Sequence, residues 1–493
     1  MHRSLVPLVL LPLLALTPTS AIAQLIELRT VPVASGDQFM IFPSEHLGMG
    51  GVHIALEDTW LDPFVNPARG AAAGAGRVFA IPAFYSVGKN AGSAATLSAG
   101  GLTGARTVFA GGLVALQQIK SGQDFFGAIP FDDFGPLPPD ALSQRSATNK
   151  YAALFLGTRV PTGVALGVGV TLADLSAMDG VEHLYALASN ITQSGHLADV
   201  RVGAVKGLTN GGSLEGLLLY DHVSMTHDVT YLDWIMPDSA TGIWQQTTRR
   251  EINLDRTSTW GVHLAFRRPI GERGWQLGGI LTGNYKSHPK IPNYEIVNIP
   301  RDPGHSTALD IGIGMAKQAD ALTVGMDLVY EPGWSSTWAV AATPTATADG
   351  DTVPAGGHTL ENEFRFSNAR INVGVGYDVG LATLQFGLQV RANDYHLDQW
   401  NIVANRIRLQ NEQWLEWTPS WSARLRLQGL DLQYMGRVTT GTGRPGVAWS
   451  ASAATRALDA GLANDIVVPP SGPLTLQEAA VWTHQFSVAV PIR

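Results

Sequence analysis

Apolar and polar residues alternate over many short stretches of this chain. In residues 384–391, every second side chain is apolar: Leu384, Phe386, Leu388 and Val390. Residues 309–316 and 421–428 show the same period of two. Successive side chains of a β-strand point to opposite faces, whereas the apolar residues of a helix recur every three or four positions. The pattern therefore predicts strands with one apolar face.

The alternation continues along the chain from residue 77 onward. It is clear at 197–204, 260–267, 322–331, 371–378, 430–437 and 486–492, and weaker at 77–87, 106–119, 148–159 and 163–173. Stretches such as 207–212 and 270–274 contain the Gly and Asn residues that are typical of hairpin turns. Between 14 and 16 segments qualify as strands, with hardly any amphipathic helix among them. We therefore predict an all-β fold, an antiparallel β-barrel of about 14 strands, over residues 77–493.

Charged residues on the second face of the strands favour a membrane barrel over a soluble β-sandwich. A dry sandwich core would have to bury these charges at high cost, whereas a wet lumen accommodates them. The lumen-facing candidates are Arg201, Asp310, Asp327, Arg391, Arg424 and Arg426, together with Asp431. The apolar face would then contact the outer-membrane lipid. Length alone would suggest about three soluble domains, but one barrel accounts for the whole chain.

The connections between strands and the tryptophans support the same fold. Short turns alternate with long polar or Gly/Pro-rich segments at 120–147, 232–250, 288–305, 339–358, 396–411 and 441–478. Outer-membrane barrels have short periplasmic turns and long outer loops. Tryptophans near strand ends are typical of an aromatic girdle at the membrane interface, although they could also fill a core: Trp334, Trp338, Trp414, Trp417 and Trp421.

Composition fits a surface that faces lipid and narrows the chemistry. Only 15% of the 493 residues are charged, while 45% are hydrophobic and 54 are glycine. Lipid-facing positions exclude charge, which explains the shortage. The absence of cysteine excludes disulfides, thiolate zinc sites and cysteine nucleophiles.

The first residues have the features of a secretory signal peptide. Arg3 precedes an apolar run at 5–16, and a small-residue site ends at Ala23, so we predict residues 1–23 to be removed. A buried N-terminal helix is the alternative, but Pro7 and Pro12 would each break it. Loss of Arg3 leaves 32 basic against 41 acidic residues, a net charge of −9. This acidic balance argues against nucleic acid as a partner.

Residues 24–76 do not alternate and contain glycine and proline motifs. They include Leu47-Gly48-Met49-Gly50-Gly51, an apolar stretch that ends in Glu57-Asp58, and Asn66-Pro67-Ala68. These motifs resemble the N-terminal signature of the long-chain fatty-acid transporter (FadL-like) family of Gram-negative outer membranes, in its broad sense. The chain departs from that signature at Arg69-Gly70, where Gly-Leu is usual, and at Trp60, where small residues are common.

The resemblance implies a plug, or hatch, at residues 24–76 inside a 14-stranded barrel, with hydrophobic compounds leaving sideways through an opening in the wall. Structural or gating roles would fall to Gly48, Met49, Gly50, Gly51, Asp58, Asn66, Pro67 and Ala68. Glycine permits close backbone approaches that side chains would prevent, and Asn-Pro favours a fixed turn. A plain periplasmic segment that leads into the first strand is the alternative.

No motif indicates catalysis. The chain lacks His-Glu-x-x-His, a phosphate-binding Gly-x-x-x-x-Gly-Lys loop and a Gly-x-Ser-x-Gly elbow. Asp394 with His396, or Asp132 with Asp133, could act as acid and base, and Asp349-Gly350-Asp351 could bind a hard cation, but such pairs are expected by chance. We therefore expect no enzyme activity, no cofactor and no metal site.

The sequence supports two functions from different classes. The first is passive uptake of hydrophobic small molecules, such as fatty acids, by a monomer in the outer membrane. The second is a non-transporting anchor or shuttle of a protein-secretion system, as found in relatives that share the Leu-Gly-Met-Gly-Gly signature. A bound lipid would favour the first function, and stoichiometric protein partners would favour the second.

Overall fold

The structure is a computed structural model that describes residues 26–74, 76–104, 107–122, 146–181, 188–209, 211–235, 245–271, 273–287, 304–445 and 476–492. The predicted signal peptide at 1–23 and the pair Asp132 and Asp133 lie outside the described residues.

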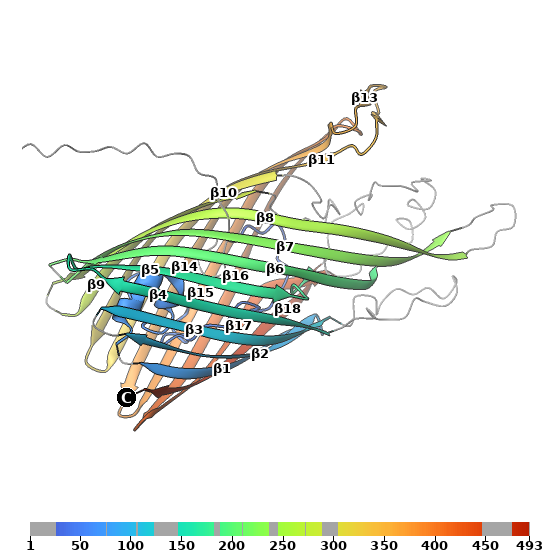
Figure 1. The fold of residues 1–493 in the computed structure, drawn as a ribbon. Coiled ribbons are helices and arrows are strands. Elements are labelled where there is room, and N and C mark those ends of the chain that lie inside the picture. The colour runs from blue at the N-terminus through green and yellow to red at the C-terminus, as the bar shows by residue number, and fades with distance from the viewer. Residues whose placement is uncertain are drawn as a thin grey trace, which may run out of the picture.

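Sixteen antiparallel strands form a closed barrel (Figure 1). Each strand pairs with its neighbours in the chain, and β1 pairs with β18 to close the ring. The strands are β1 (Arg77–Val87), β2 (Gly92–Gly104), β3 (Val108–Ser121), β4 (Ser146–Arg159), β5 (Val164–Leu175), β6 (Ala188–Gly207), β7 (Ser213–Ile235), β8 (Gln245–Ile270), β9 (Trp275–Ser287), β10 (Gly304–Ala319), β11 (Leu322–Val340), β14 (His358–Val379), β15 (Ala382–Asn401), β16 (Arg406–Leu427), β17 (Leu430–Pro445) and β18 (Leu476–Pro491).

The predicted all-β antiparallel barrel is confirmed, with sixteen strands where about 14 were expected. β2 is the clearest reason for the shortfall, because Gly, Ala, Ser and Thr occupy both of its faces and leave little apolar contrast. The predicted long connection at 396–411 was wrong. β15 and β16 extend through most of it, and only residues 402–405 connect them.

The two ends of the barrel differ in the length of their connections. At one end, which we call the short-turn end, seven connections of two to five residues join neighbouring strands, among them 320–321, 380–381 and 428–429. Gly380 and Gly429 have φ values of +61° and +83°, which tight hairpins require. At the other end the β11–β14 connection contains a separate hairpin, β12 (Thr345–Ala346) with β13 (Thr352–Val353).

The outside of the barrel is apolar and the inside is largely polar or small. On β4 and β5, the outward side chains of Leu154, Leu156 and Val168 are 61%, 60% and 53% exposed, while the inward-facing Asn149 is fully buried. Such an outer surface would be unfavourable in water but suits lipid. The alternation that indicated strands therefore sets lipid-facing side chains against lumen-facing ones, as in membrane-spanning barrels.

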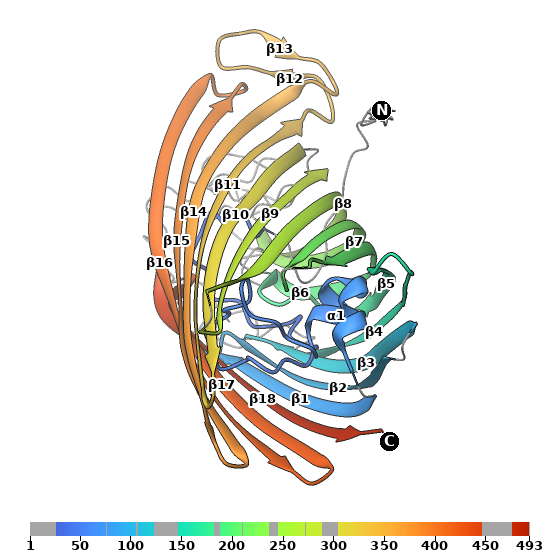
Figure 2. The same ribbon diagram turned by 90° about the vertical axis from the view of Figure 1, so that its left-hand side faces the viewer.

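The N-terminal residues 26–74, which we call the plug, lie inside the barrel (Figure 2). They contain only a four-residue helix, α1 (Asp62–Val65), and a 3₁₀ helix, η1 (Pro67–Ala72). η1 contacts β4, β5 and β6. In the described part of the chain, no helix is long and apolar enough to cross a membrane.

Candidate functional site

The motif residues at 48–51 form hydrogen bonds with the inner faces of β15 and β16. The amide of Gly48 donates to Oε1 of Gln385 (3.2 Å), and the amide of Gly50 donates to Oγ of Ser420 (3.0 Å). The Ser420 hydroxyl in turn donates to the carbonyl oxygen of Gly48 (3.1 Å). The barrel wall therefore satisfies backbone groups that the plug, which has almost no secondary structure, cannot satisfy itself.

Glycines on both sides make this close approach sterically possible. A Cβ atom on Gly387 would lie 2.0 Å from the amide nitrogen of Gly50, and one on Gly374 would lie 2.4 Å from the carbonyl oxygen of Met49. Gly50 and Gly51 have φ values of +64° and +81°, which disfavour any other residue there. The backbone of Met49-Gly50-Gly51 therefore packs directly against a part of the wall that has no side chains.

A second flat part of the wall holds residues 52–54. The side chain or carbonyl group of Ile54 lies against three wall glycines on β9 and β10: Gly278, Gly312 and Gly314. One carboxylate oxygen of Asp327 accepts hydrogen bonds from the amides of His53 (2.8 Å) and Ile54 (3.2 Å). Asp327 is fully buried, and these bonds to the plug compensate part of the cost of burying its charge.

The Asn-Pro-Ala motif begins η1 on a third glycine surface. Asn66 caps η1, since its Oδ1 accepts a hydrogen bond from the amide of Ala68 (3.2 Å). A Cβ on Gly203 would lie 1.8 Å from Oδ1 of Asn66, and one on Gly167 would lie 2.5 Å from the carbonyl carbon of Pro67. The motif therefore fits only where the wall has no side chains.

Arg201 on β6 binds the carboxyl end of α1. Its Nη1 donates to the carbonyl oxygens of Val65 (2.8 Å) and Phe64 (3.3 Å), while its Nε donates to Asp199 (2.9 Å). The last carbonyls of a helix have no partner within the helix, and a cation is favourable there. Arg201 and Asp199 are 4% and 0% exposed, so this ion pair is a buried part of the plug's attachment.

Asp58 organises the turn that precedes α1. Its carboxylate accepts hydrogen bonds from the amides of Trp60 (3.0 Å), Leu61 (3.0 Å) and Glu45 (2.8 Å), and from the hydroxyl of Ser44. A single side chain thus joins two plug segments that are more than ten residues apart in sequence.

Trp60, one of the departures from the family signature, lies between two arginines. The guanidinium of Arg424 is 4.7 Å from the centre of the Trp60 ring, and that of Arg77 is 5.1 Å away. Arg424 also binds Asp431 (2.8 Å) and Glu45 (3.1 Å). The indole offers a cation–π contact to each arginine, so a large aromatic residue has a specific place here.

Arg69, the other departure, is the centre of an ionic network on the floor of the lumen. Its guanidinium donates to Glu215 of β7 (2.8 Å), and it lies 3.3 Å from both Glu57 and Asp62. Arg267 of β8 is 3.5 Å from the same two carboxylates. We call these five residues the ionic floor. Two cations and three carboxylates share a site that is mostly buried.

The charge imbalance of the ionic floor affects Asp62. Burial raises the pKa of Asp62 to about 7, the charges of Asp58 and Glu215 add to the shift, and Arg69 opposes it. An aspartate in an unfolded plug would ionise near its ordinary value of 3.8. Between about pH 4 and pH 7, Asp62 keeps its proton in the docked plug but would lose it in an undocked one. The contribution of Asp62 to the stability of docking therefore decreases as the pH rises through this range.

The first described residues of the plug are held by charges on β15, β16 and β11. Arg391 binds Glu27 (3.1 Å) and Glu331 (3.3 Å), and Arg29 binds Glu416 (3.1 Å). Glu331 and Glu416 are nearly fully buried, so each charge on the wall depends on an oppositely charged partner.

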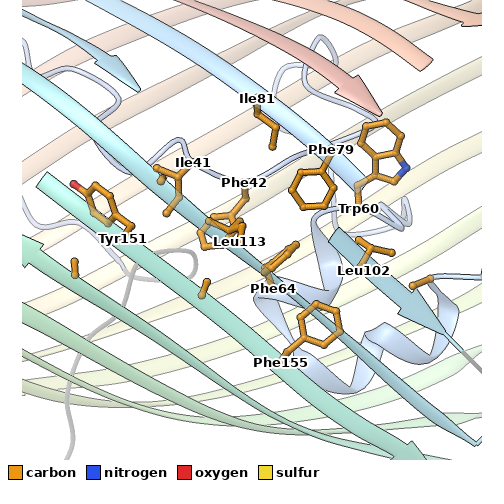
Figure 3. Close-up of a cluster of buried hydrophobic side chains, with 14 of the residues drawn as sticks. Ile41, Phe42, Trp60, Phe64, Phe79, Ile81, Leu102, Leu113, Tyr151 and Phe155 are labelled. Carbon is orange, nitrogen blue, oxygen red and sulfur yellow. The ribbon is translucent and has the colours of Figure 1, made fainter. Parts of the chain in front are cut away.

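Between these polar attachments, the plug packs against an apolar part of the wall (Figure 3). Phe64 makes edge-to-face contacts with Phe79 of β1 (6.4 Å between ring centres) and Phe155 of β4 (5.2 Å), and it stacks at a tilt on Phe42 (5.1 Å). The cluster joins aromatic and aliphatic side chains of the plug to those of β1–β5: Ile41, Phe42, Trp60, Phe64, Phe79, Ile81, Leu102, Phe109, Leu113, Tyr151, Phe155 and Leu175.

A hollow of about 650 Å³ lies in the wall behind this cluster. Outward-facing side chains line it, among them Leu154, Leu156 and Val168. Leu102 and Phe155, which belong to the inner apolar cluster, also line it. The apolar interior and the outer hollow therefore share two side chains.

No protein-family model and no curated protein matches this chain. Among solved structures, a Pseudomonas aeruginosa FadL homologue is 11% identical with a TM-score of 0.46, and the alignment covers 92% of this chain and 99% of that one. The toluene transporter TbuX of Ralstonia pickettii is 10% identical with a TM-score of 0.38, covering 90% and 97%. The Pseudomonas putida toluene transporter TodX is 10% identical with a TM-score of 0.38, covering 90% and 96%. At such low similarity, the function has to be argued from the residues of this chain.

The remaining lumen candidates lie at different depths. Asp310 on β10 is 8% exposed, and its carboxylate is 4.0 Å from Arg370. Arg426 lies next to the short-turn end of β16, where its side chain is 48% exposed and pairs with Asp378 (3.2 Å). Arg426 is thus at the rim of the barrel and not in contact with the plug residues described above.

The structure places the candidate acid–base pair of β15 outside the lumen. Asp394 and His396 lie on outward-facing positions of β15, where Asp394 binds Gln413 (2.9 Å) and His396 binds Asp398 (2.9 Å). Trp414 was expected in the outer girdle, but its indole points into the lumen and donates to Glu416 (3.0 Å). Trp414 is even-numbered on a strand whose even positions face inward, which the sequence pattern alone could have shown.

The candidate cation loop is a simple hairpin turn. Asp349 accepts a hydrogen bond from Thr347 and lies in the connection between β12 and β13. Across the described ranges, no group of three or more His, Asp or Glu residues is arranged to hold a metal ion.

Sequence reasoning missed the ionic floor and the partners of Trp60. Arg69 was visible only as a departure from a family signature, and Glu215 is one of several charged residues on its strand, with Asp221 and Asp228 among them. The available signal was the charge of Arg69 in a segment that was expected to pack inside a barrel. A buried arginine requires a carboxylate partner, so an acidic residue on the wall could have been expected.

Proposed function

We propose that this chain is an outer-membrane channel for passive uptake of hydrophobic small molecules, fatty acids or aromatic hydrocarbons among them, and that it acts as a monomer with residues 24–76 as its plug. One observation carries the proposal. Leu102 and Phe155 belong both to the apolar cluster inside the lumen and to the lining of the outer hollow.

The chemistry of the hollow suits this role. Its volume lies in the range of small-molecule sites. Its lining combines glycines, such as Gly101 and Gly111, with leucine and valine side chains. Backbone pairing between β2, β3 and β4 is continuous at these residues, so passage from the inner cluster past Leu102 and Phe155 into lipid requires these strands to part locally. The overall driving force is the transfer of the compound's apolar surface from water into lipid.

The proposal is tested by a substitution that fills the hollow with a large side chain on the outer face of the barrel. Ala110 faces outward on β3 and lines the hollow, so Ala110→Trp would occupy it with an indole without touching the plug. The matched control is Ala99→Trp, at an outward position of β2 that does not line the hollow. We expect Ala110→Trp to lower the initial rate of uptake of a labelled fatty acid or toluene about tenfold, equivalent to about 1.4 kcal/mol.

Uptake is measured in a deletion strain that expresses each variant at equal levels in its outer membrane. Equal rates in the deletion strain, the Ala110→Trp strain and the wild type would refute the proposal. If equal rates came with stoichiometric protein partners on purification, an anchor or shuttle of a secretion system would be favoured instead.

A further inference from the structure

The inner wall of the barrel has two chemically different sides. On β1–β5 it carries most residues of the apolar cluster, which also reaches Leu197 of β6 and Met225 of β7. On β8, from Arg249 to Arg267, the inward positions hold charged or polar residues and no apolar side chain larger than Ala265. Only Gly261 and Ala265 interrupt this row of polar inward side chains, and Leu219 of β7 lies over Gly261. A barrel that carried only apolar compounds would not need so many polar inward positions on one strand.

The polar side continues across neighbouring strands by register. Thr259 of β8 is paired with Asp221 of β7 and with Lys286 of β9, and Lys286 is paired with Ser306 of β10. Two inward positions further toward the short-turn end, His263 pairs with Thr282, which pairs with Asp310. We call the inward positions of 249–267, together with Asp221, Asn284, Lys286, Ser306 and Asp310, the polar strip.

Several side chains of the polar strip are buried without a protein partner. Both polar atoms of Asn253 and of Asn284, and the hydroxyl of Ser306, have no hydrogen bond to any described residue. These residues are 2%, 5% and 1% exposed. Because nearly all buried polar groups form hydrogen bonds, amide and hydroxyl groups in this arrangement are suited to bind water or a polar solute.

The polar strip ends at the ionic floor. Arg267, its last inward residue, is 3.5 Å from Glu57 and from Asp62 of the plug. The side chain of Glu57 is 58% exposed, so water can replace Arg267 at this carboxylate when the pair separates, whereas the apolar cluster would have to expose large side chains. The contact between plug and wall that is easiest to open for a charged solute is therefore at the end of this strip.

We propose that the polar strip is a hydrated path that conducts small cations through the lumen, and that the ionic floor closes it. Above the floor, four inward carboxylates, of Asp221, Glu251, Asp255 and Asp310, face three cations, of Arg249, Lys286 and Arg370, the last of which lies 4.0 Å from Asp310. An excess of negative charge along a narrow polar path raises the local concentration of cations. This activity goes beyond the proposed uptake of hydrophobic compounds, because its solute is water-soluble and its route runs along β8–β10, away from the outer hollow on β2–β5.

The test records currents through the purified full-length protein in planar lipid bilayers that separate unequal concentrations of potassium chloride. We expect stepwise conductance with a reversal potential that indicates preference for potassium over chloride. Asp221→Asn and Asp310→Asn are nearly isosteric and should each lower the potassium-to-chloride permeability ratio about twofold. The matched control is Asp228→Asn, which changes the outer face of the same strand as Asp221, where Asp228 binds Arg250.

Opening of the floor is tested separately. Arg69→Ala removes the central cation of the floor and should increase the time spent in the conducting state. Because this variant leaves Glu215 without its partner, Arg69→Ala with Glu215→Gln provides a second variant with balanced charge. Each variant is first shown to migrate as a folded barrel, by its altered mobility on gels before heating.

Two results would overturn the proposal. One is the absence of conductance steps from the wild type and from both floor variants. The other is a change of permeability ratio in Asp228→Asn as large as that in Asp221→Asn. The wild type could also conduct only rarely while the floor variants conduct often. If Asp221→Asn then lowers the permeability ratio of the floor variants, the result supports the proposal and shows that the floor is closed most of the time.

Discussion

At the scale of single residues, glycines of the wall are as important for attachment of the plug as the side chains that bind it. Wall glycines lie beneath Met49, Gly50, Ile54 and Asn66, at distances where a Cβ would overlap backbone or side-chain atoms. Glycine in a strand lowers stability because it has no side chain to pack and because it loses more conformational entropy on folding than other residues. Its use on inner faces is therefore explained by the backbone that it allows to approach.

Replacing one of these glycines should displace the plug. In Gly387→Ala, the new methyl group would lie 2.0 Å from the amide nitrogen of Gly50. Overpacking of this kind costs about 1–3 kcal/mol, so we expect faster hydrogen exchange at the amides of residues 48–51, measured by mass spectrometry. Gly216→Ala is the control, because a Cβ there would meet only Leu264 at 3.7 Å, and an equal effect of both substitutions would contradict the steric explanation.

At the scale of elements, α1 is too short to be stable by itself. A four-residue helix forms only one turn, and nucleation of a turn is unfavourable in isolation. Its start is fixed by Asp58 and its end by Arg201. The element is therefore formed by the barrel, and not by its own propensity.

The ion pair that holds α1 gives a second prediction. Arg201→Met would remove the partner of the buried Asp199 and leave the carbonyls of Phe64 and Val65 without a donor. Breaking a buried pair on one side costs about 3–5 kcal/mol, so limited proteolysis should cut the plug of this variant much faster than that of the wild type. Adding Asp199→Asn should restore part of the protection, and a double variant that is cut faster than Arg201→Met would contradict this account.

At the scale of the whole molecule, barrel and plug differ in what holds them. The barrel is a closed ring of strand pairs from β1 to β18 and has no free sheet edge. The plug has little secondary structure and depends on contacts with the wall around the lumen. The barrel should therefore tolerate loss of the plug better than the plug tolerates changes in the barrel.

Deleting residues 26–74 tests this asymmetry. We expect the variant to keep the gel mobility of a folded barrel before heating, because no strand pair is lost, and to conduct ions with steps several times larger than those of the full chain. Deleting residues 345–353 removes only the β12–β13 hairpin and should leave the conductance unchanged. Failure of the plug-deleted chain to reach the folded mobility would show that the ring needs the plug to close.

Much of the architecture is encoded in local sequence pattern. A period of two in hydrophobicity determines strands and separates lipid-facing from lumen-facing positions, as Leu384 and Gln385 show, because neighbouring side chains in a strand must point to opposite sides. Two-residue turns such as 428–429 fix antiparallel neighbours. The number of strands was harder to predict from the sequence, because the two faces of β2 differ little in hydrophobicity.

The arrangement around the plug was decided only by the tertiary structure. Arg69 and Glu215 are 146 positions apart, and Gly50 and Gly387 are further apart still, so no local pattern could pair them. The two-sided lumen has the same origin, since it becomes visible only when closure of the ring turns the inner faces of β1–β5 and β8–β10 toward one lumen. Periodicity determined which side chains enter the lumen, whereas closure of the ring and the path of the plug decided which of them meet.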